Sequence, residues 1–142
     1  MKKILLAGLF LITAISIYVF FPRNKNTPTI TTKASQDKII GRYLDYSKEV
    51  FDNAVGKKKI YFFHAKWCPT CKVANEEFLR EEDKIPNDVL LFKTDYDTEK
   101  ELKTQYGITY QHTFVLVDNE GKEIRKWNGG GITELINNIA NR

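Results

Sequence analysis

Runs of apolar residues along the chain predict buried strands that alternate with helices. The three strongest runs contain few polar residues and are bounded by turn residues, which is typical of strands with both faces covered. They are Lys59–Phe63, Val89–Phe92 and Thr113–Val117. We expect a shorter first strand at Ile39–Tyr43 and a last strand at Glu123–Trp127, which follows a hairpin turn at Asp118–Gly121.

In the segments between these strands, apolar residues recur at helical spacing, which predicts helices. Ser47 is a typical N-cap residue, and the helix behind it is expected to end near Gly56. A second helix follows the two cysteines and runs to about Glu82, and a short third helix covers about 98–106. Thr133 is the predicted N-cap of the last helix. The apolar positions of the second helix are Val73, Ala74, Phe78 and Leu79, and those of the last helix are Leu135, Ile136 and Ile139.

The order of these elements predicts the fold class. Strands and helices alternate along most of the chain, which then closes with a hairpin and a helix. Such an order is typical of an α/β domain with a mixed central sheet and helices on both faces.

The first 21 residues form a separate hydrophobic segment. After the basic Met1–Lys3, the uncharged run Ile4–Phe21 has 18 residues. As a helix it would cover about 27 Å, close to the hydrocarbon thickness of a bilayer. The run ends in bulky residues, and its one small-x-small pattern is Ala14–Ser16, so we favour a retained transmembrane helix over a cleaved signal peptide. Either alternative exports the rest of the chain, to the periplasm or cell surface if anchored and into the medium if cleaved.

Composition and charge indicate how the rest of the chain is organised and which partners it lacks. Residues 22–34 are polar, threonine-rich and contain two prolines, which predicts a linker. Residues 35–142 then form one folded domain. The 22 basic and 18 acidic residues give a net charge of +4 without a basic stripe, so we expect no nucleic-acid partner. We also expect a monomer.

Both cysteines of the chain lie in Trp67-Cys68-Pro69-Thr70-Cys71, between a predicted strand and a predicted helix. A thiolate at a helix N-terminus faces unpaired backbone N–H groups and the positive end of the helix dipole, which lowers its pKa. This placement favours a redox-active pair over a static disulfide or two structural cysteines.

Motif and element order together resemble the thioredoxin-like superfamily across nearly all of residues 35–142. The shared features are Trp-Cys-x-x-Cys-Lys at a helix start, Tyr-Gly-Ile after a short helix and a later Thr-Phe-Val-Leu strand. The resemblance implies that Cys68 is an exposed nucleophilic thiol and Cys71 a buried resolving thiol. It also places Lys93 near the floor of the site. Trp67 is expected to give partner peptides a surface to pack on, and Pro69 and Thr70 between the cysteines are expected to tune the redox potential.

Two departures from the family pattern adjoin the cysteines. His112 occupies the position where the family has a cis-proline facing the cysteine pair, and Phe62 replaces a buried aspartate that helps to deprotonate the resolving cysteine. A non-proline cis bond costs about 3–4 kcal/mol, so the Gln111–His112 bond should be trans, or strained for a purpose. His112 either lines the groove or stabilises the Cys68 thiolate and shuttles its proton.

The sequence therefore supports two functions. The first is a thiol-disulfide oxidoreductase that acts on exported proteins through Cys68 and Cys71, exchanging electrons with another thiol protein and requiring no bound cofactor. The second is a zinc- or copper-binding module in which His64 or His112 joins both cysteines. The motif leaves open whether the pair works as reductant, oxidant or isomerase.

Overall fold

The computed structural model describes residues 41–140 of the chain. The predicted transmembrane segment and linker, and the beginning of the predicted first strand, lie outside the described residues. Within the described part, no helix is long and apolar enough to span a membrane.

A mixed five-stranded sheet forms the centre of residues 41–140, in the order β1-β3-β2-β4-β5. The strands are β1 Tyr43–Asp45, β2 Lys58–His64, β3 Val89–Asp95, β4 Thr113–Val117 and β5 Glu123–Asn128. β1, β3 and β2 run parallel, while β4 is antiparallel to both β2 and β5. The predicted mixed sheet is therefore confirmed.

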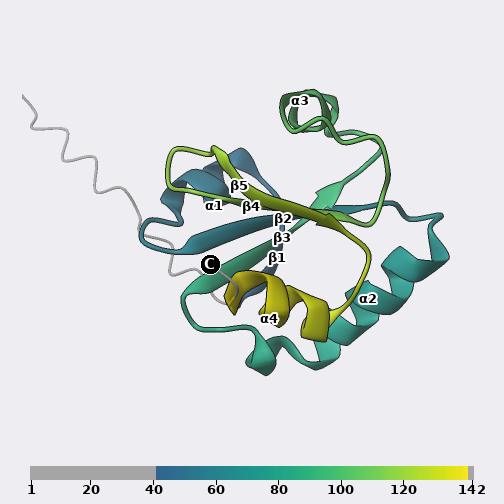
Figure 1. Ribbon diagram of the computed structural model, residues 1–142, viewed down its shortest axis with the longest axis horizontal. Coiled ribbons are helices and arrows are strands. Elements are labelled where there is room, and N and C mark those ends of the chain that lie inside the picture. The colour runs from purple at the N-terminus through teal and green to yellow at the C-terminus, as the bar shows by residue number, and fades with distance from the viewer. Residues whose placement is uncertain (1–40, 141–142) are drawn as a thin grey trace, which may run out of the picture. The chain divides into compact units, whose positions relative to one another are not determined.

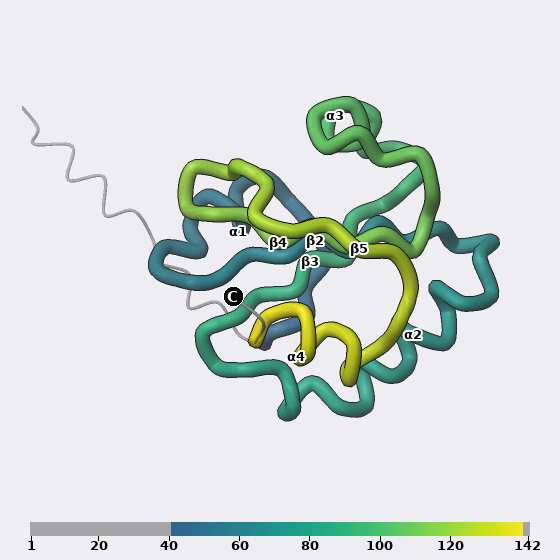
Figure 2. The backbone as a smooth tube through the Cα atoms, viewed as in Figure 1, coloured from purple at the N-terminus to yellow at the C-terminus, as the bar shows by residue number. Residues whose placement is uncertain are grey.

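Helices cover both faces of this sheet (Figure 1). α2 Pro69–Arg80 and α4 Ile132–Ala140 lie on one face, and α1 Lys48–Asn53 and α3 Lys100–Gln105 lie on the other. The chain leaves β5, turns through three glycines and returns beside α2 as α4 (Figure 2).

Each face of the sheet has its own core, because successive side chains of a strand point to opposite sides. In β2, Ile60 and Phe62 pack toward α2 and α4, whereas Tyr61 and Phe63 pack toward α1 and α3. The second core is rich in aromatic residues, and Phe51 of α1 stacks on Tyr61 with ring centroids 5.0 Å apart.

The structure corrects several predicted boundaries. The first strand is Tyr43–Asp45 and not 39–43, because its register is set by pairing with β3, Tyr43 opposite Leu91. α3 begins at Lys100, two residues later than expected, because the Asp95 carboxylate holds a turn by accepting hydrogen bonds from the N–H groups of Asp97 and Thr98.

Some expected helix positions are also wrong. Ala74 and Phe78 of α2 are buried, but Val73 and Leu79 are exposed, since the helix has one face on the sheet. Thr133 lies within α4 and is not its N-cap; the Glu134 carboxylate accepts the Gly131 N–H at this helix start instead.

Ser47, by contrast, is the N-cap of α1, as predicted, and its hydroxyl accepts the Val50 N–H.

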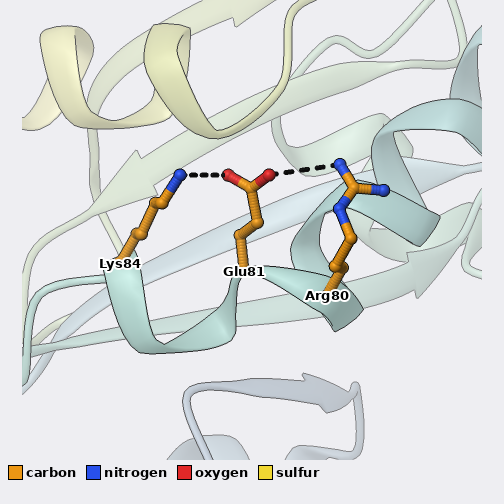
Figure 3. A network of polar contacts seen from close by, with 3 residues as sticks. All are labelled: Arg80, Glu81 and Lys84. Carbon is orange, nitrogen blue, oxygen red and sulfur yellow. Dashed lines mark hydrogen bonds and ion pairs between the residues drawn. The ribbon is translucent and has the colours of Figure 1, made fainter.

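The C-terminal end of α2 is held by an exposed charge network (Figure 3). The helix ends at Arg80, two residues before the predicted end, and a 3₁₀ turn, η1, covers Glu82–Lys84. The Glu81 carboxylate lies 3.2 Å from Arg80 and 2.7 Å from Lys84. These charges connect the helix to the turn that leads toward β3.

Candidate active site at the start of α2

Cys68 lies between β2 and α2, as the sequence predicts, and is the N-cap of α2. β2 ends at His64, and Pro69 opens the first turn of α2, where its missing N–H removes no helical hydrogen bond. The Cys68 Sγ accepts the Cys71 N–H at 3.2 Å, in the manner of a capping side chain. The reactive atom therefore faces the backbone donors of the helix start.

The pKa values of the two thiols are shifted in opposite directions. Burial opposes ionisation of Cys68, but hydrogen bonds from Cys71, Thr70 and Gln111 outweigh it and place the Cys68 pKa below its ordinary value. Burial, together with the hydrogen bond to Cys68, raises the pKa of Cys71 to about 12. Cys68 is thus the thiolate-forming member of the pair.

One expectation for Cys68 is wrong. The sequence predicts an exposed nucleophile, yet Cys68 is only 2% exposed, and Cys71 is fully buried. Both belong to the core between the sheet, α2 and α4, and both thiols are free. Cys68 therefore has little contact with solvent.

His112 lies directly in front of the cysteine pair, on the segment before β4. Its peptide bond to Gln111 is trans, and its φ of 58° lies in the left-handed region that side-chain-bearing residues rarely adopt. Backbone hydrogen bonds fix this conformation: the His112 N–H donates to Phe63 O at 2.8 Å, and the Gly129 N–H donates to His112 O at 2.7 Å. The imidazole is thereby aimed at the start of α2.

Both ring nitrogens of His112 have hydrogen-bond partners. Nδ1 lies 3.0 Å from the Thr70 hydroxyl, and Nε2 lies 2.9 Å from the Gly130 carbonyl. The Thr70 hydroxyl in turn lies 3.3 Å from the Cys68 Sγ. One continuous chain of polar atoms therefore runs from the Cys68 sulfur to the glycine loop after β5.

Phe62 forms the apolar floor beneath this chain. It stacks on Phe114 with centroids 4.6 Å apart, and its ring centroid is 5.5 Å from that of His112. Phe62 is fully buried, so an aromatic ring fills the position where the sequence comparison expects a buried carboxylate.

An open groove borders the site between α2 and the glycine loop. It has a volume of about 340 Å³ and is lined by Pro69, Thr70, Val73, Ala74, Glu77, His112, Gly130 and Gly131. On the other side of the cysteines, Trp67 is 58% exposed, and its indole N–H donates to the Asp97 carboxylate. An exposed indole and a mostly apolar groove offer contacts for a bound peptide segment.

Comparisons with known proteins agree with this geometry. The thioredoxin family model matches residues 42–141. The chain belongs to the thioredoxin family. The matched residues include both cysteines at the start of α2.

Individual relatives share about a quarter to a third of their residues with this thioredoxin-family chain. Thioredoxin H5 of Oryza sativa subsp. japonica is 35% identical over 80 residues, which cover 56% of this chain and 58% of the rice protein. The crystal structure of Trxlp from Edwardsiella tarda matches with a TM-score of 0.56 and 28% identity, covering 70% of this chain and 99% of that one. Thioredoxin NaTrxh from Nicotiana alata matches with a TM-score of 0.59 and 25% identity, covering 70% and 90%.

Two other predicted site residues make no hydrogen bond to the cysteine pair within residues 41–140. Lys93 forms an ion pair with Asp45 at 2.8 Å. His64 ends β2, and burial together with the nearby Lys93 lowers its pKa.

The structure assembles one of the two predicted metal sites, the one that includes His112. Among residues 41–140, the ligand atoms of Cys68, Cys71 and His112 lie within 4.8 Å of one another and could hold an ion, whereas His64 is not part of this cluster. We assign no ion to it, because His112 Nδ1 already has Thr70 as its partner.

Sequence reasoning missed two contributors to the site. Gly130 supplies the carbonyl that orients His112, and the Gln111 side chain supplies a hydrogen bond to Cys68. The sequence signal for Gly130 was present, because three successive glycines beside a predicted site often allow a close backbone approach. Gln111 carried no signal beyond its position next to His112.

Proposed function

We propose that this protein is a thiol-disulfide oxidoreductase that acts on exported proteins through Cys68 and Cys71. The observation that carries the proposal is the inequality of the two thiols: one caps the helix with a lowered pKa, and the other lies beneath it with a pKa of about 12. Family membership over residues 42–141 supports the same chemistry.

The reaction begins when the Cys68 thiolate attacks one sulfur of a substrate disulfide. A mixed disulfide forms, and the other substrate sulfur leaves as a thiolate that takes up a proton. The Cys71 thiol then loses its proton and attacks the Cys68 sulfur, which releases the second substrate thiol. Two electrons pass from the dithiol to the substrate, and the Cys68–Cys71 pair becomes a disulfide. The reverse sequence oxidises a substrate dithiol.

The proposed compartment rests on the sequence before the folded domain. An uncharged run of 18 residues behind a basic start supports a membrane anchor with the domain outside the cytoplasm. The substrates are then thiols or disulfides of exported proteins, and the electrons come from or go to a second thiol protein.

Disulfide reduction by the purified full-length chain tests the chemistry. The wild-type chain should reduce a protein disulfide in the presence of a dithiol reductant, and Cys68→Ser should abolish turnover. Cys71→Ser should instead trap the mixed disulfide, because the resolving thiol is missing. An inert wild-type protein, or a Cys68→Ser variant as active as wild type, would overturn the proposal.

Metal analysis of the same preparation tests the alternative. The cluster of Cys68, Cys71 and His112 is the observation in favour of a metal-binding module. A chain that is inert toward disulfides and binds one zinc or copper ion through both thiols would replace the oxidoreductase. Localisation is tested separately, by asking whether an impermeant thiol reagent labels the cysteines in intact cells.

A further inference from the structure

The polar chain from Cys68 to Gly130 restricts where its protons can lie. Carbonyl oxygens only accept hydrogen bonds, so the Gly130 contact requires a proton on His112 Nε2. In a neutral imidazole, Nδ1 is then an acceptor, and the Thr70 hydroxyl must donate to it. Since that hydroxyl has a single proton, its contact with Cys68 is filled only when the Cys68 S–H donates to the Thr70 oxygen.

Transfer of one proton from Cys68 to His112 reverses both hydrogen bonds of the Thr70 hydroxyl without moving a heavy atom, while Nε2–H still donates to Gly130. If His112 is an imidazolium, Nδ1–H donates to the Thr70 oxygen. The Thr70 hydroxyl proton is then free to donate to the Cys68 thiolate. A thiolate beside a neutral imidazole would leave one of the two acceptors without the hydroxyl proton. The geometry thus favours two states with the same number of protons, in which the transferred proton lies on either Cys68 or His112.

We propose that Thr70 and His112 form a proton relay that takes the proton from Cys68 and returns it during exchange. The relay rests on the proposed disulfide exchange and specifies how its nucleophile is made. The Cys68 proton passes to the Thr70 oxygen while the Thr70 hydroxyl proton passes to His112 Nδ1, so the step gives a thiolate and an imidazolium with no change in electron count. The same path delivers a proton to the departing substrate thiolate.

The surroundings of His112 suit this role. The imidazole is 8% exposed, its backbone is fixed in the left-handed region, and its Nε2 is held by Gly130. The residue therefore reaches Thr70 with little freedom to turn away. Phe62 and Phe114 pack against its ring and exclude water from that side.

Few other ionisable groups compete for this proton. The titratable groups near His112 are Cys68, Cys71 and Glu77 from α2 and His64 from β2, while Glu134 of α4 binds the Gly131 N–H. Glu77 lines the groove, outside the chain of hydrogen bonds. Phe62 offers no carboxylate, so the histidine is the proton acceptor that the polar chain reaches.

Two substitutions of Thr70 test the relay in the full-length reduced chain. Thr70→Val keeps the shape of the side chain and removes the hydroxyl, whereas Thr70→Ser keeps the hydroxyl. We follow the ultraviolet absorbance of the thiolate with pH and the rate of alkylation of Cys68. Thr70→Val should raise the apparent Cys68 pKa by about one unit or more and slow alkylation several-fold below that pKa, and Thr70→Ser should remain close to wild type.

The tautomer of His112 gives a second readout. Nitrogen chemical shifts of the neutral imidazole should show a proton on Nε2 and a hydrogen-bonded Nδ1 in the wild-type chain. In Thr70→Val the Nδ1 signal should move to that of a ring nitrogen without this hydrogen bond. The chain has two histidines, so His64→Asn assigns the remaining signals to His112.

Two further variants complete the test. His112→Asn tolerates the left-handed backbone but accepts no proton, so it should reproduce the effect of Thr70→Val on Cys68. Thr104→Val, on exposed α3, removes a hydroxyl that bonds only the Lys100 carbonyl and should leave Cys68 unchanged.

An unaltered Cys68 titration in both Thr70→Val and His112→Asn would overturn the relay. Because alkylation needs no disulfide substrate, this result is independent of the exchange assay. A chain inactive toward disulfides in which both variants still change the Cys68 titration would overturn the proposed function alone.

Discussion

The two ends of α2 use polar groups in opposite ways. At the N-terminal end, hydrogen bonds connect Cys68 through the Thr70 hydroxyl to His112 beside the core. At the C-terminal end, Glu81 bridges Arg80 and Lys84 on the surface. One helix therefore carries a partly buried site at its start, in which Cys68 and His112 are buried and Thr70 is exposed, and a solvated charge network at its end.

The difference between these ends is one of dielectric environment. Buried polar atoms interact strongly and are costly when left without a partner, whereas exposed ion pairs are weakened by water and salt. Substitution of one polar side chain at the start of α2 should therefore alter the reactivity of the cysteine pair. Removal of a charge at the end of α2 should hardly alter reactivity or stability. The following four predictions test this contrast, from the largest effect to the smallest.

The two thiols at the helix start should ionise far apart. The Cys68 pKa is lowered from its ordinary value, and that of Cys71 is raised to about 12. Near neutral pH the thiolate population of Cys68 should then exceed that of Cys71 by about 100-fold or more. As pH rises, alkylation mapped on peptides should reach Cys68 first and Cys71 only as pH approaches 12. Equal labelling of both cysteines near neutral pH would contradict the contrast.

Substitution of Phe78 tests how much the buried apolar face of α2, between its two ends, contributes to stability. It is fully buried against Tyr43, Phe62 and Phe114, so Phe78→Ala should lower the free energy of unfolding by about 3–5 kcal/mol. Chemical denaturation measures this loss. The neighbouring Leu79 is 60% exposed, and Leu79→Ala is the control, expected to change stability by less than about 1 kcal/mol.

Trp67 tests whether the rim of the site contacts substrate. Trp67→Ala removes an exposed indole and should raise KM for a protein disulfide about tenfold, because aromatic side chains are frequent contact hot spots. A small soluble disulfide should be reduced as before. The control Ile124→Ala removes an equally exposed apolar side chain from β5 and should leave both substrates unaffected.

Glu81→Gln should have the smallest effect. The change removes both ion pairs at the end of α2, yet their charges are exposed, so the midpoint of chemical unfolding should stay almost the same. Any difference from wild type should shrink further as salt is added. A large loss of stability would show that this end of the helix is as strongly coupled as the other.

The central strands and the position of the cysteines were predictable because their signals are local. β2, β3 and β4 follow runs of apolar residues, and Ser47 is a local capping signal. The first strand was misplaced because its register depends on pairing with β3, a contact between distant segments. Val73 and Leu79 show a similar limit: helical spacing identifies apolar positions but not how wide a stripe the sheet covers.

The sequence predicted which residues belong to the candidate site better than it predicted which of their atoms are in contact. The sequence placed His112 opposite the cysteines and Thr70 between them, and the structure brings all three together. It could not show that the hydroxyl of Thr70 lies between sulfur and imidazole, because that depends on the left-handed backbone of His112 and on the carbonyl of Gly130. Burial of Cys68 was also unpredictable, since it follows from packing against distant elements.

The two tryptophans of the chain are intrinsic fluorophores in different environments, so they can report on different events. Trp67 adjoins the cysteine pair in contact with solvent, so its emission should respond to substrate docking and to the charge of Asp97. Trp127 stacks on Phe114 with centroids 5.1 Å apart, and its buried Nε1 has no hydrogen-bond partner among the described residues. Its emission maximum should be typical of a tryptophan in an apolar environment and should shift only when the sheet unfolds. Fluorescence can therefore separate events at the site from loss of the fold in one sample.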